Sequence, residues 1–293
     1  MTGEPDQLSF HSNFIVLHLT LALNSLKEIL VRTASGIVFL IIVIGSILIH
    51  PVAFLVVFAG FTVLGLKEYF ELTTDKHISP LYLILGILLY FLIGLIGTDI
   101  LAPFHFVWII LVLPLVLVIH LFEKKRNMAE IGAVFSGYFY VAVPFGLMNW
   151  FAMMSNRGGM LYNYLLISLF VIVWCNDIFA YLSGSFLGKH KLFERISPKK
   201  TWEGFVGGMI FALLAGYILS LFFHDLTLIQ WLVLSSIIVV TGTLGDLSES
   251  MLKRYAGVKD SGSLMPGHGG VLDRFDAVLF ATPFVLIYLE TVL

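Results

Sequence analysis

Residues 33–66 read TASGIVFLIIVIGSILIHPVAFLVVFAGFTVLGL and contain no Asp, Glu, Lys or Arg. One helix of these 34 residues would be about 51 Å long, whereas the hydrocarbon core of a bilayer is about 30 Å thick. The stretch must therefore turn back on itself. Proline disfavours helical geometry at the residue before it, so His50-Pro51 is the expected break. The stretch predicts two membrane-spanning helices, over residues 34–49 and 51–72.

The composition of the whole chain is typical of a membrane protein. Of its 293 residues, 59% are apolar and only 12% are charged, about half the usual charged share of a soluble domain. The mean hydropathy is +0.97. These values exclude an ordinary soluble domain, a disordered chain and a collagen-like repeat. The formal net charge of −2 gives no basic footprint for nucleic acid. The single cysteine, Cys175, excludes an intramolecular disulfide and a thiolate metal cluster.

Further charge-poor windows predict seven more spans. These are residues 77–98, 100–122, 131–156, 161–183, 204–223, 227–246 and 275–293. We therefore expect an all-α polytopic integral membrane protein with about nine transmembrane helices. Residues 1–26 do not fit a signal peptide and are taken as an N-terminal extension. Residues 27–293 are expected to form one membrane-embedded domain.

The distribution of basic residues predicts the orientation of the chain. With nine spans and a cytoplasmic N-terminus, 16 of the 17 Lys and Arg residues lie on the cytoplasmic side, and only Arg157 lies outside. The C-terminus is then outside. The two long polar loops, 184–203 and 247–274, face the cytosol, and any chemistry is expected there.

One acidic residue, Asp177, interrupts the predicted span 161–183. A carboxylate in such a run costs several kcal/mol unless it has a partner or faces a polar cavity. A Lys or Arg on another helix would be a structural explanation. A place in a cation or substrate site would be a functional one, and the second interpretation is favoured.

The loop 184–203 carries five basic residues and includes the run SPKKTWEG, which starts at Ser197. Positive-inside charge, or attraction to anionic lipid headgroups, would account for the charge alone. The order of residue types also suggests a phosphate site. Lys199 and Lys200 would neutralise phosphates, and the hydroxyl groups of Ser197 and Thr201 would donate hydrogen bonds to phosphate oxygens.

The loop 247–274 combines charged residues with glycines. Pro266-Gly-His-Gly-Gly predicts a tight turn whose main-chain N–H groups could face phosphate oxygens. Carboxylates without thiolates suit a hard cation such as Mg²⁺, and Arg and Lys suit phosphate. A solvated loop would explain the polarity but not this mixture. His268 could be a general base, a phosphate contact or a turn residue, and phosphate contact is favoured.

Three stretches of the chain resemble a known enzyme family. The 27 residues SMLKRYAGVKDSGSLMPGHGGVLDRFD, from Ser250 to Asp276, are similar to the signature of the phosphatidate cytidylyltransferases, also called CDP-diacylglycerol synthases. Two shorter stretches also resemble the family: NDIFAY from Asn176 and SPKKTWEG from Ser197. The resemblance covers residues 27–293, which it identifies as a cytidylyltransferase domain.

The resemblance implies transfer of the cytidylyl group of CTP to phosphatidate, which gives CDP-diacylglycerol and pyrophosphate for phospholipid biosynthesis. It implies a homodimer in the cell inner (plasma) membrane, with its active site facing the cytoplasm. It also implies a two-cation centre, Mg²⁺ with K⁺, at Asp246 and Asp273. Catalytic or phosphate-contacting roles are expected for Asp177, Lys253, Arg254, Lys259, Asp260, His268 and Arg274. Substrate binding is expected for Ser197, Lys199, Lys200, Thr201, Gly267, Gly269 and Gly270.

Two other functions remain as alternatives. A CTP-dependent lipid-alcohol kinase would release CDP and no pyrophosphate. An ion or anion transporter with Asp177 in its path would be expected to show inverted repeats or paired broken helices, and the sequence shows no such pattern. A CDP-alcohol phosphatidyltransferase is less favoured because the chain has no Asp-Gly-x-x-Ala-Arg stretch. Pyrophosphate release from CTP and phosphatidate discriminates between these functions.

Overall fold

The structure of the protein is a computed structural model. It describes residues 30–31, 33–74, 79–97, 100–122, 128–151, 164–262 and 269–293. The predicted N-terminal extension 1–26 and two of the predicted site residues, Gly267 and His268, lie outside these ranges.

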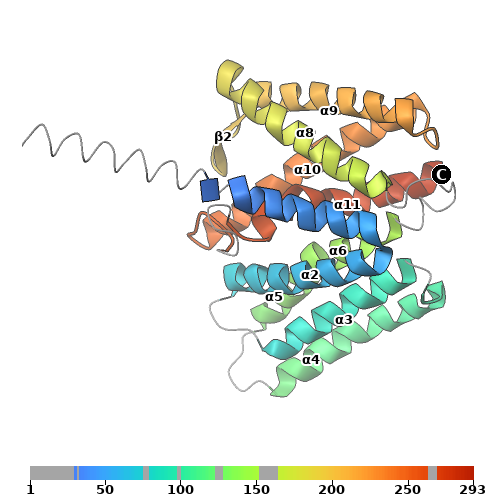
Figure 1. The fold of residues 1–293 in the computed structure, drawn as a ribbon. Coiled ribbons are helices and arrows are strands. Elements are labelled where there is room, and N and C mark those ends of the chain that lie inside the picture. Colours follow the sequence, from blue (N-terminus) through green and yellow to red (C-terminus); the bar gives the residue numbers. More distant parts are fainter. Residues whose placement is uncertain are drawn as a thin grey trace, which may run out of the picture.

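Helices form nearly all of the described chain (Figure 1). A first helix over Thr33–Ile49 is followed by α2 (Pro51–Thr73), α3 (Pro80–Gly97), the 3-10 segment η1 (Pro103–Leu111) continued by α4 (Val112–Phe122), α5 (Ala129–Gly137) continued by the π-segment η2 (Tyr138–Ala142) and by α6 (Val143–Met148), α8 (Tyr164–Leu187), α9 (Trp202–Phe222), α10 (Leu228–Tyr255) and α11 (Leu272–Val292).

The helices confirm the all-α polytopic membrane fold. In the described part of the chain, eight continuous helical segments are long and apolar enough to cross a membrane. The helix Thr33–Ile49 is shorter, at the lower end of the usual span length, and corresponds to the first predicted span, 34–49. Which end of the bundle faces the cytoplasm stays a prediction.

The break predicted at His50-Pro51 is confirmed. The first helix ends at Ile49, and α2 begins with Pro51 at its first position, where the missing N–H of proline costs nothing. The Nδ1 atom of His50 accepts a hydrogen bond from the N–H of Val52 at 3.1 Å. The histidine therefore caps the second helix of the pair.

Two predicted boundaries are wrong: the end of the span 227–246 and the beginning of the span 275–293. The helix α10 continues to Tyr255, so Asp246 lies within it rather than at its end. A charge-free window stops at the first carboxylate, but a helix continues where charged residues find partners one turn apart, as Glu249 and Lys253 do. Similarly, α11 begins at Leu272, which places Asp273 in its first turn.

The loop 184–203 contains a hairpin that the sequence analysis did not predict. The strands β1 (Lys191–Phe193) and β2 (Ser197–Thr201) pair antiparallel, with Lys191 opposite Thr201 and Phe193 opposite Ser197. Strands this short, without alternating apolar residues, leave almost no periodic signal. The hairpin lies at the end of the bundle where α10 ends and α11 begins, opposite the C-terminus (Figure 1).

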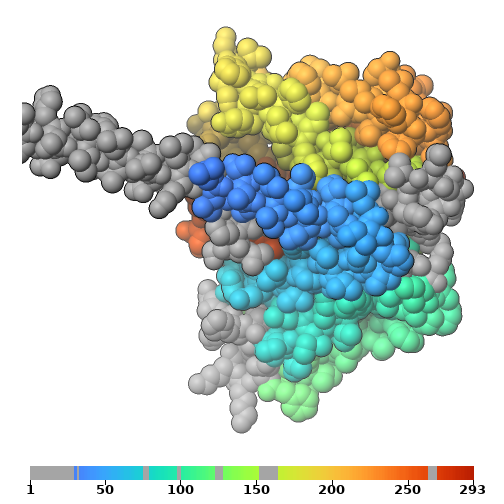
Figure 2. All heavy atoms as spheres, viewed as in Figure 1, coloured from blue at the N-terminus to red at the C-terminus, as the bar shows by residue number. Residues whose placement is uncertain are grey.

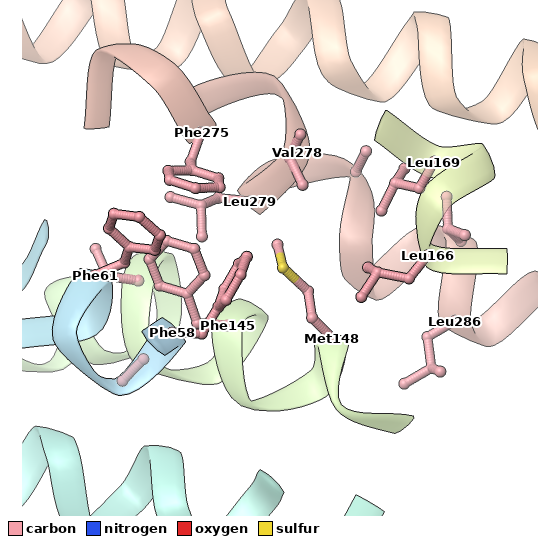
Figure 3. Packing of buried hydrophobic residues seen from close by; sticks show 14 of the residues in the cluster. Phe58, Phe61, Phe145, Met148, Leu166, Leu169, Phe275, Val278, Leu279 and Leu286 are labelled. Atoms are coloured by element: carbon pink, nitrogen blue, oxygen red, sulfur yellow. The ribbon is translucent and has the colours of Figure 1, made fainter. Parts of the chain in front are cut away.

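The start of α11 is held by an aromatic cluster (Figure 3). The ring of Phe275 is fully buried, and its centroid lies 5.1 Å from those of Phe61 and Phe145 and 5.7 Å from that of Phe58. These rings come from α2, α6 and α11. Because aromatic pairs in such tilted and edge-on geometries add to the energy of burial, the cluster fixes the helix that carries Asp273.

The outer helices expose many apolar side chains. Val206, Ile210 and Leu214 are exposed along α9, and Ile110 and Leu121 are exposed along η1 and α4. Soluble proteins rarely leave contiguous apolar surfaces of this kind open to water. In lipid, exposed apolar side chains have no such cost, so the surface is that expected of a membrane protein.

Candidate active site

A cavity of about 530 Å³ opens among α8, α9, α10 and the hairpin, a volume typical of small-molecule sites. Five of the residues that line it are charged: Lys191, Lys199, Lys200, Asp177 and Asp246. The surface is hollowed between the yellow helix α8 and the blue first helix, near the hairpin end of the molecule (Figure 2). Five predicted site residues from three separate parts of the sequence meet here: the two aspartates, Lys199, Lys200 and Thr201.

Close packing of α8 on α9 brings Asp177 to the hairpin. A Cβ atom at Gly204 would lie 2.8 Å from the carbonyl oxygen of Ala180, and one at Gly208 would lie 2.9 Å from that of Asn176. Because side chains larger than hydrogen do not fit at these distances, the two glycines let the helix backbones approach. Gly204 also lines the cavity.

Asp177 faces the cavity. Its Oδ1 atom accepts a hydrogen bond of 3.3 Å from Asn176 Nδ2, and none of the ion pairs found in the described ranges includes it. The Oδ1 atom of Asn176 is buried without a hydrogen-bond partner. This placement favours the functional interpretation of Asp177 over a structural ion pair.

Lys200 and Asp246 form an ion pair at the cavity wall. The pair joins Lys200 Nζ to Asp246 Oδ2, and the two side chains are 28% and 35% exposed. The other carboxylate oxygen, Oδ1, accepts from Ser250 Oγ at 3.3 Å. A pair with this exposure can be reached by a ligand, so an incoming phosphate could take the lysine and leave the carboxylate for a cation.

Side chains at the base of the hairpin attach it to α9. Thr201 is the N-cap residue, because its hydroxyl oxygen accepts from Gly204 N–H at 3.2 Å. Glu203, in the first turn of α9, accepts from His190 Nδ1 at 2.6 Å and from Lys189 N–H at 3.1 Å. Thr201 lines the cavity, whereas Ser197 is not among the lining residues.

A second group of charged residues lies at the start of α11, outside the cavity lining. Lys253 Nζ lies 2.6 Å from Asp273 Oδ1 and also pairs with Glu249. The Glu249 side chain is completely buried, and those of Lys253 and Asp273 are 13% and 7% exposed. A lysine between two buried carboxylates satisfies charges that would be costly alone.

The second carboxylate oxygen of Asp273 is also occupied. Asp273 Oδ2 accepts from Ser261 N–H at 2.9 Å, from Ser261 Oγ at 3.0 Å and from Gly270 N–H at 2.8 Å. Gly269 adopts a φ of +82°, and a Cβ atom there would strike the same oxygen. The amide of Gly270, predicted to face phosphate, thus donates within the protein.

The two carboxylates predicted to share cations have separate partners. Asp246 pairs with Lys200 and Asp273 pairs with Lys253. Within the described residues, no group of three or more His, Cys, Asp or Glu side chains is arranged to hold a metal ion. A cation site here would need substrate oxygens as further ligands, and the assignment stays a prediction.

The chain is similar in sequence to enzymes that transfer cytidylyl groups. The profile of the cytidylyltransferase family matches residues 30–292. A phosphatidate cytidylyltransferase of Staphylococcus aureus (strain COL) is 35% identical over 270 residues, which cover 88% of this chain and 98% of the relative. One of Staphylococcus haemolyticus (strain JCSC1435) is 44% identical over 168 residues, which cover 57% of this chain and 62% of the relative.

The chain belongs to the cytidylyltransferase family. It is a nucleotidyltransferase, and the resemblance seen in three short stretches of sequence is confirmed over nearly the whole length.

Sequence reasoning missed Glu68, one of the two acidic residues of α2 in this cytidylyltransferase. Its side chain is buried and accepts hydrogen bonds from the N–H groups of Val271 and Leu272, both at 2.9 Å. The residue lies inside the predicted span 51–72, so the rule applied to Asp177 would have found it. Glu249 was missed because the predicted span 227–246 ends before it, whereas α10 continues to Tyr255.

The remaining predicted residues of the cytidylyltransferase do not line the cavity. Four of them lie on the last turns of α10, on the segment that follows it or on the first turn of α11, and all four are exposed: Arg254, Lys259, Asp260 and Arg274. Arg254 Nε lies 3.5 Å from the carbonyl oxygen of Ile196 in the hairpin. The predicted site is thus divided between the cavity and the start of α11.

Proposed function

We propose that this chain transfers the cytidylyl group of CTP to phosphatidate and releases pyrophosphate. The observation that carries the proposal is the cavity, where three lysines and two aspartates meet at one end of apolar helices. A polyanionic nucleotide and the headgroup of a membrane lipid can both reach such a place. Family membership supports the cytidylyl donor, and the names of the staphylococcal relatives support phosphatidate as the acceptor.

The reaction mainly requires that the two substrates are positioned correctly and that the negative charge of their phosphates is neutralised. A phosphate oxygen of phosphatidate attacks the α-phosphorus of CTP, the bond from that phosphorus to the bridging oxygen breaks, and pyrophosphate leaves with the bonding electrons. The attacking phosphate is already anionic, so no general base is needed. Lys191, Lys199 and Lys200 would hold the phosphates together and offset the charge that develops on them.

The oxygen donors of the cavity fit a hard cation. Asp177 and Asp246 line it, and the Oδ1 atom of Asn176 is buried without a partner. Mg²⁺ binds through one or two carboxylates together with substrate phosphates. We propose that Asp246 and Asp273 hold Mg²⁺, with K⁺ as a second cation. To do so, Asp246 would exchange its contact with Lys200 for the cation, and Asp273 would exchange its contact with Lys253. When bound, the cations would neutralise charge on the transferring phosphates.

The cation assignment can be measured with and without turnover. Asp246→Asn should raise the Mg²⁺ concentration needed for half-maximal rate, and it should weaken the stabilisation against heat that Mg²⁺ with CTP gives to the wild type. Asp273→Asn should show the same two changes, a higher Mg²⁺ requirement and a weaker stabilisation by Mg²⁺ with CTP. Wild-type Mg²⁺ dependence in both variants would contradict the assignment.

We also propose that the site faces the cytoplasm from the plasma membrane, as the distribution of basic residues indicates. A cysteine in place of Arg195, an exposed residue of the hairpin, serves as the probe in a Cys175→Ser background. An impermeant thiol reagent should label it only after the cells are permeabilised. Labelling of intact cells would reverse the orientation. The homodimer and the absence of nucleic-acid partners stay predictions.

The decisive assay uses purified protein with CTP and phosphatidate in mixed micelles. Pyrophosphate and CDP-diacylglycerol should form in equal amounts and only when both substrates are present. Formation of CDP from CTP and diacylglycerol would instead indicate the lipid-alcohol kinase. A protein that releases no phosphatidate-dependent pyrophosphate would overturn the proposed function.

A further inference from the structure

Glu68 lies far in sequence from the residues discussed above and yet contacts the segment that holds Asp273. It lies on α2, and its carboxylate accepts hydrogen bonds from the N–H groups of Val271 and Leu272, each at 2.9 Å. These are the amides at the start of α11, and no residue of the helix itself caps them with a side chain. A carboxylate at a helix N-terminus satisfies free donors and interacts favourably with the helix dipole.

The glycines of the segment before α11 leave room for this carboxylate. A Cβ atom at Gly262 would lie 2.5 Å from Glu68 Oε1, and a Cβ atom at Gly270 would strike Glu68 Oε2. The backbone therefore passes directly against the carboxylate on two sides. These glycines are explained by the need to enclose Glu68 as well as by turn geometry.

Ser261 connects Glu68 to Asp273. Its hydroxyl oxygen lies 3.1 Å from Glu68 Oε2 and 3.0 Å from Asp273 Oδ2, so its one proton can be donated to either. The Ser261 amide donates to Asp273 as well. All three side chains are nearly closed to solvent. A displacement of Glu68 would therefore change the position of the Asp273 carboxylate, because the Ser261 hydroxyl and the first turn of α11 connect the two side chains.

We propose that Glu68 is a positioning residue for cytidylyl transfer: it anchors the start of α11 and, through Ser261, sets the orientation of Asp273. The inference rests on the proposed function, because Asp273 is assigned there to the reacting phosphates and their cation. Glu68 itself touches no substrate in this scheme. Its effect should appear in the rate of the chemical step rather than in the binding of either substrate.

The test is Glu68→Gln, compared with Glu71→Gln. Glutamine keeps one acceptor oxygen but turns an NH₂ group toward one of the two amides that Glu68 accepts from. Glu71 lies on the same helix, is 54% exposed, and pairs only loosely with Lys67 at 3.9 Å. Per folded protein, Glu68→Gln should lower kcat at least about tenfold with both KM values within about threefold of wild type, the pattern of a contact that matters in the transition state.

A second readout does not depend on activity. Amide hydrogen exchange at Val271 and Leu272 should be faster in Glu68→Gln than in wild type, and unchanged in Glu71→Gln. Ser261→Ala removes the shared hydroxyl with little change in volume and, like Glu68→Gln, should lower kcat. The double variant should lose little more than Glu68→Gln alone, because both changes act on one path.

Each result decides the matter. Wild-type kcat in folded Glu68→Gln overturns the inference, as does a loss confined to one KM. If Glu68→Gln cannot be recovered folded, Ser261→Ala decides, and a kcat within about twofold of wild type overturns the inference. Absence of phosphatidate-dependent pyrophosphate in both the wild type and Glu71→Gln would instead refute the proposed function.

Discussion

The cavity and the cluster at the start of α11 use the same residue types in different ways. In the cavity, Lys200 pairs with Asp246, and both side chains are about one-third exposed. In the cluster, Lys253 pairs with Glu249 and Asp273, and the most exposed of the three is only 13% exposed. Exposed pairs contribute little to stability, whereas breaking a buried pair leaves a charge without compensation.

The difference separates two tasks. A partly exposed ion pair can exchange its partner for a ligand, as a site for phosphates and cations requires. A buried network of ion pairs and hydrogen bonds holds the backbone in one arrangement. The cavity is therefore expected to govern substrate affinity and turnover, and the cluster is expected to govern folding and the geometry of the segment that carries Asp273.

The largest expected effect is on the cluster. Lys253→Ala would leave Glu249 and Asp273 buried without their cation, which should lower the free energy of unfolding by about 3–5 kcal/mol. Thermal unfolding in detergent measures the change. A midpoint equal to that of wild type would show that the cluster does not stabilise the fold. The proposed difference between the cluster and the cavity would then be wrong.

The matched change in the cavity should act on activity instead. Lys200→Ala removes a charged contact of a kind worth about 1.5–3 kcal/mol, so kcat/KM for CTP should fall about 10- to 100-fold. Stability should change by less than about 1 kcal/mol because the pair is partly exposed. Loss of folded protein with unchanged kinetics would place Lys200 with the cluster rather than with the cavity.

Asp177 tests whether a carboxylate in a transmembrane helix belongs to the cavity. Asp177→Asn should lower kcat/KM about tenfold, equivalent to about 1.4 kcal/mol, while the protein stays inserted and folded. Steady-state rates on protein recovered from membranes measure this. Full activity would make Asp177 a structural residue.

The smallest effect is expected at the edge of the cavity. Ser197 lies on β2 but is not among the residues that line the cavity, although the sequence predicted a phosphate contact. Ser197→Ala should change kcat/KM for CTP by less than about threefold, an amount smaller than the loss of one typical hydrogen bond. A tenfold loss would extend the substrate site along the hairpin.

The sequence by itself determined the class of fold and the family. Charge-free windows identify spans because a charge in the bilayer core is costly and a helix satisfies its own backbone groups. The 27-residue signature and the run SPKKTWEG carried the family resemblance, since both have fixed spacing. Asp177 was found because a carboxylate is rare in an apolar helix.

Only the tertiary structure decided which charged residues lie together. Hydrophobic periodicity says where a helix runs, but an ion pair between Lys200 and Asp246 depends on how α9, α10 and the hairpin pack. Glu68 is the clearest case: it is separated from Val271 by most of the chain, and only the packing of α2 against the start of α11 makes it a cap. Contacts of this kind leave no local pattern, because they are set by the burial of side chains such as Phe275 between distant helices.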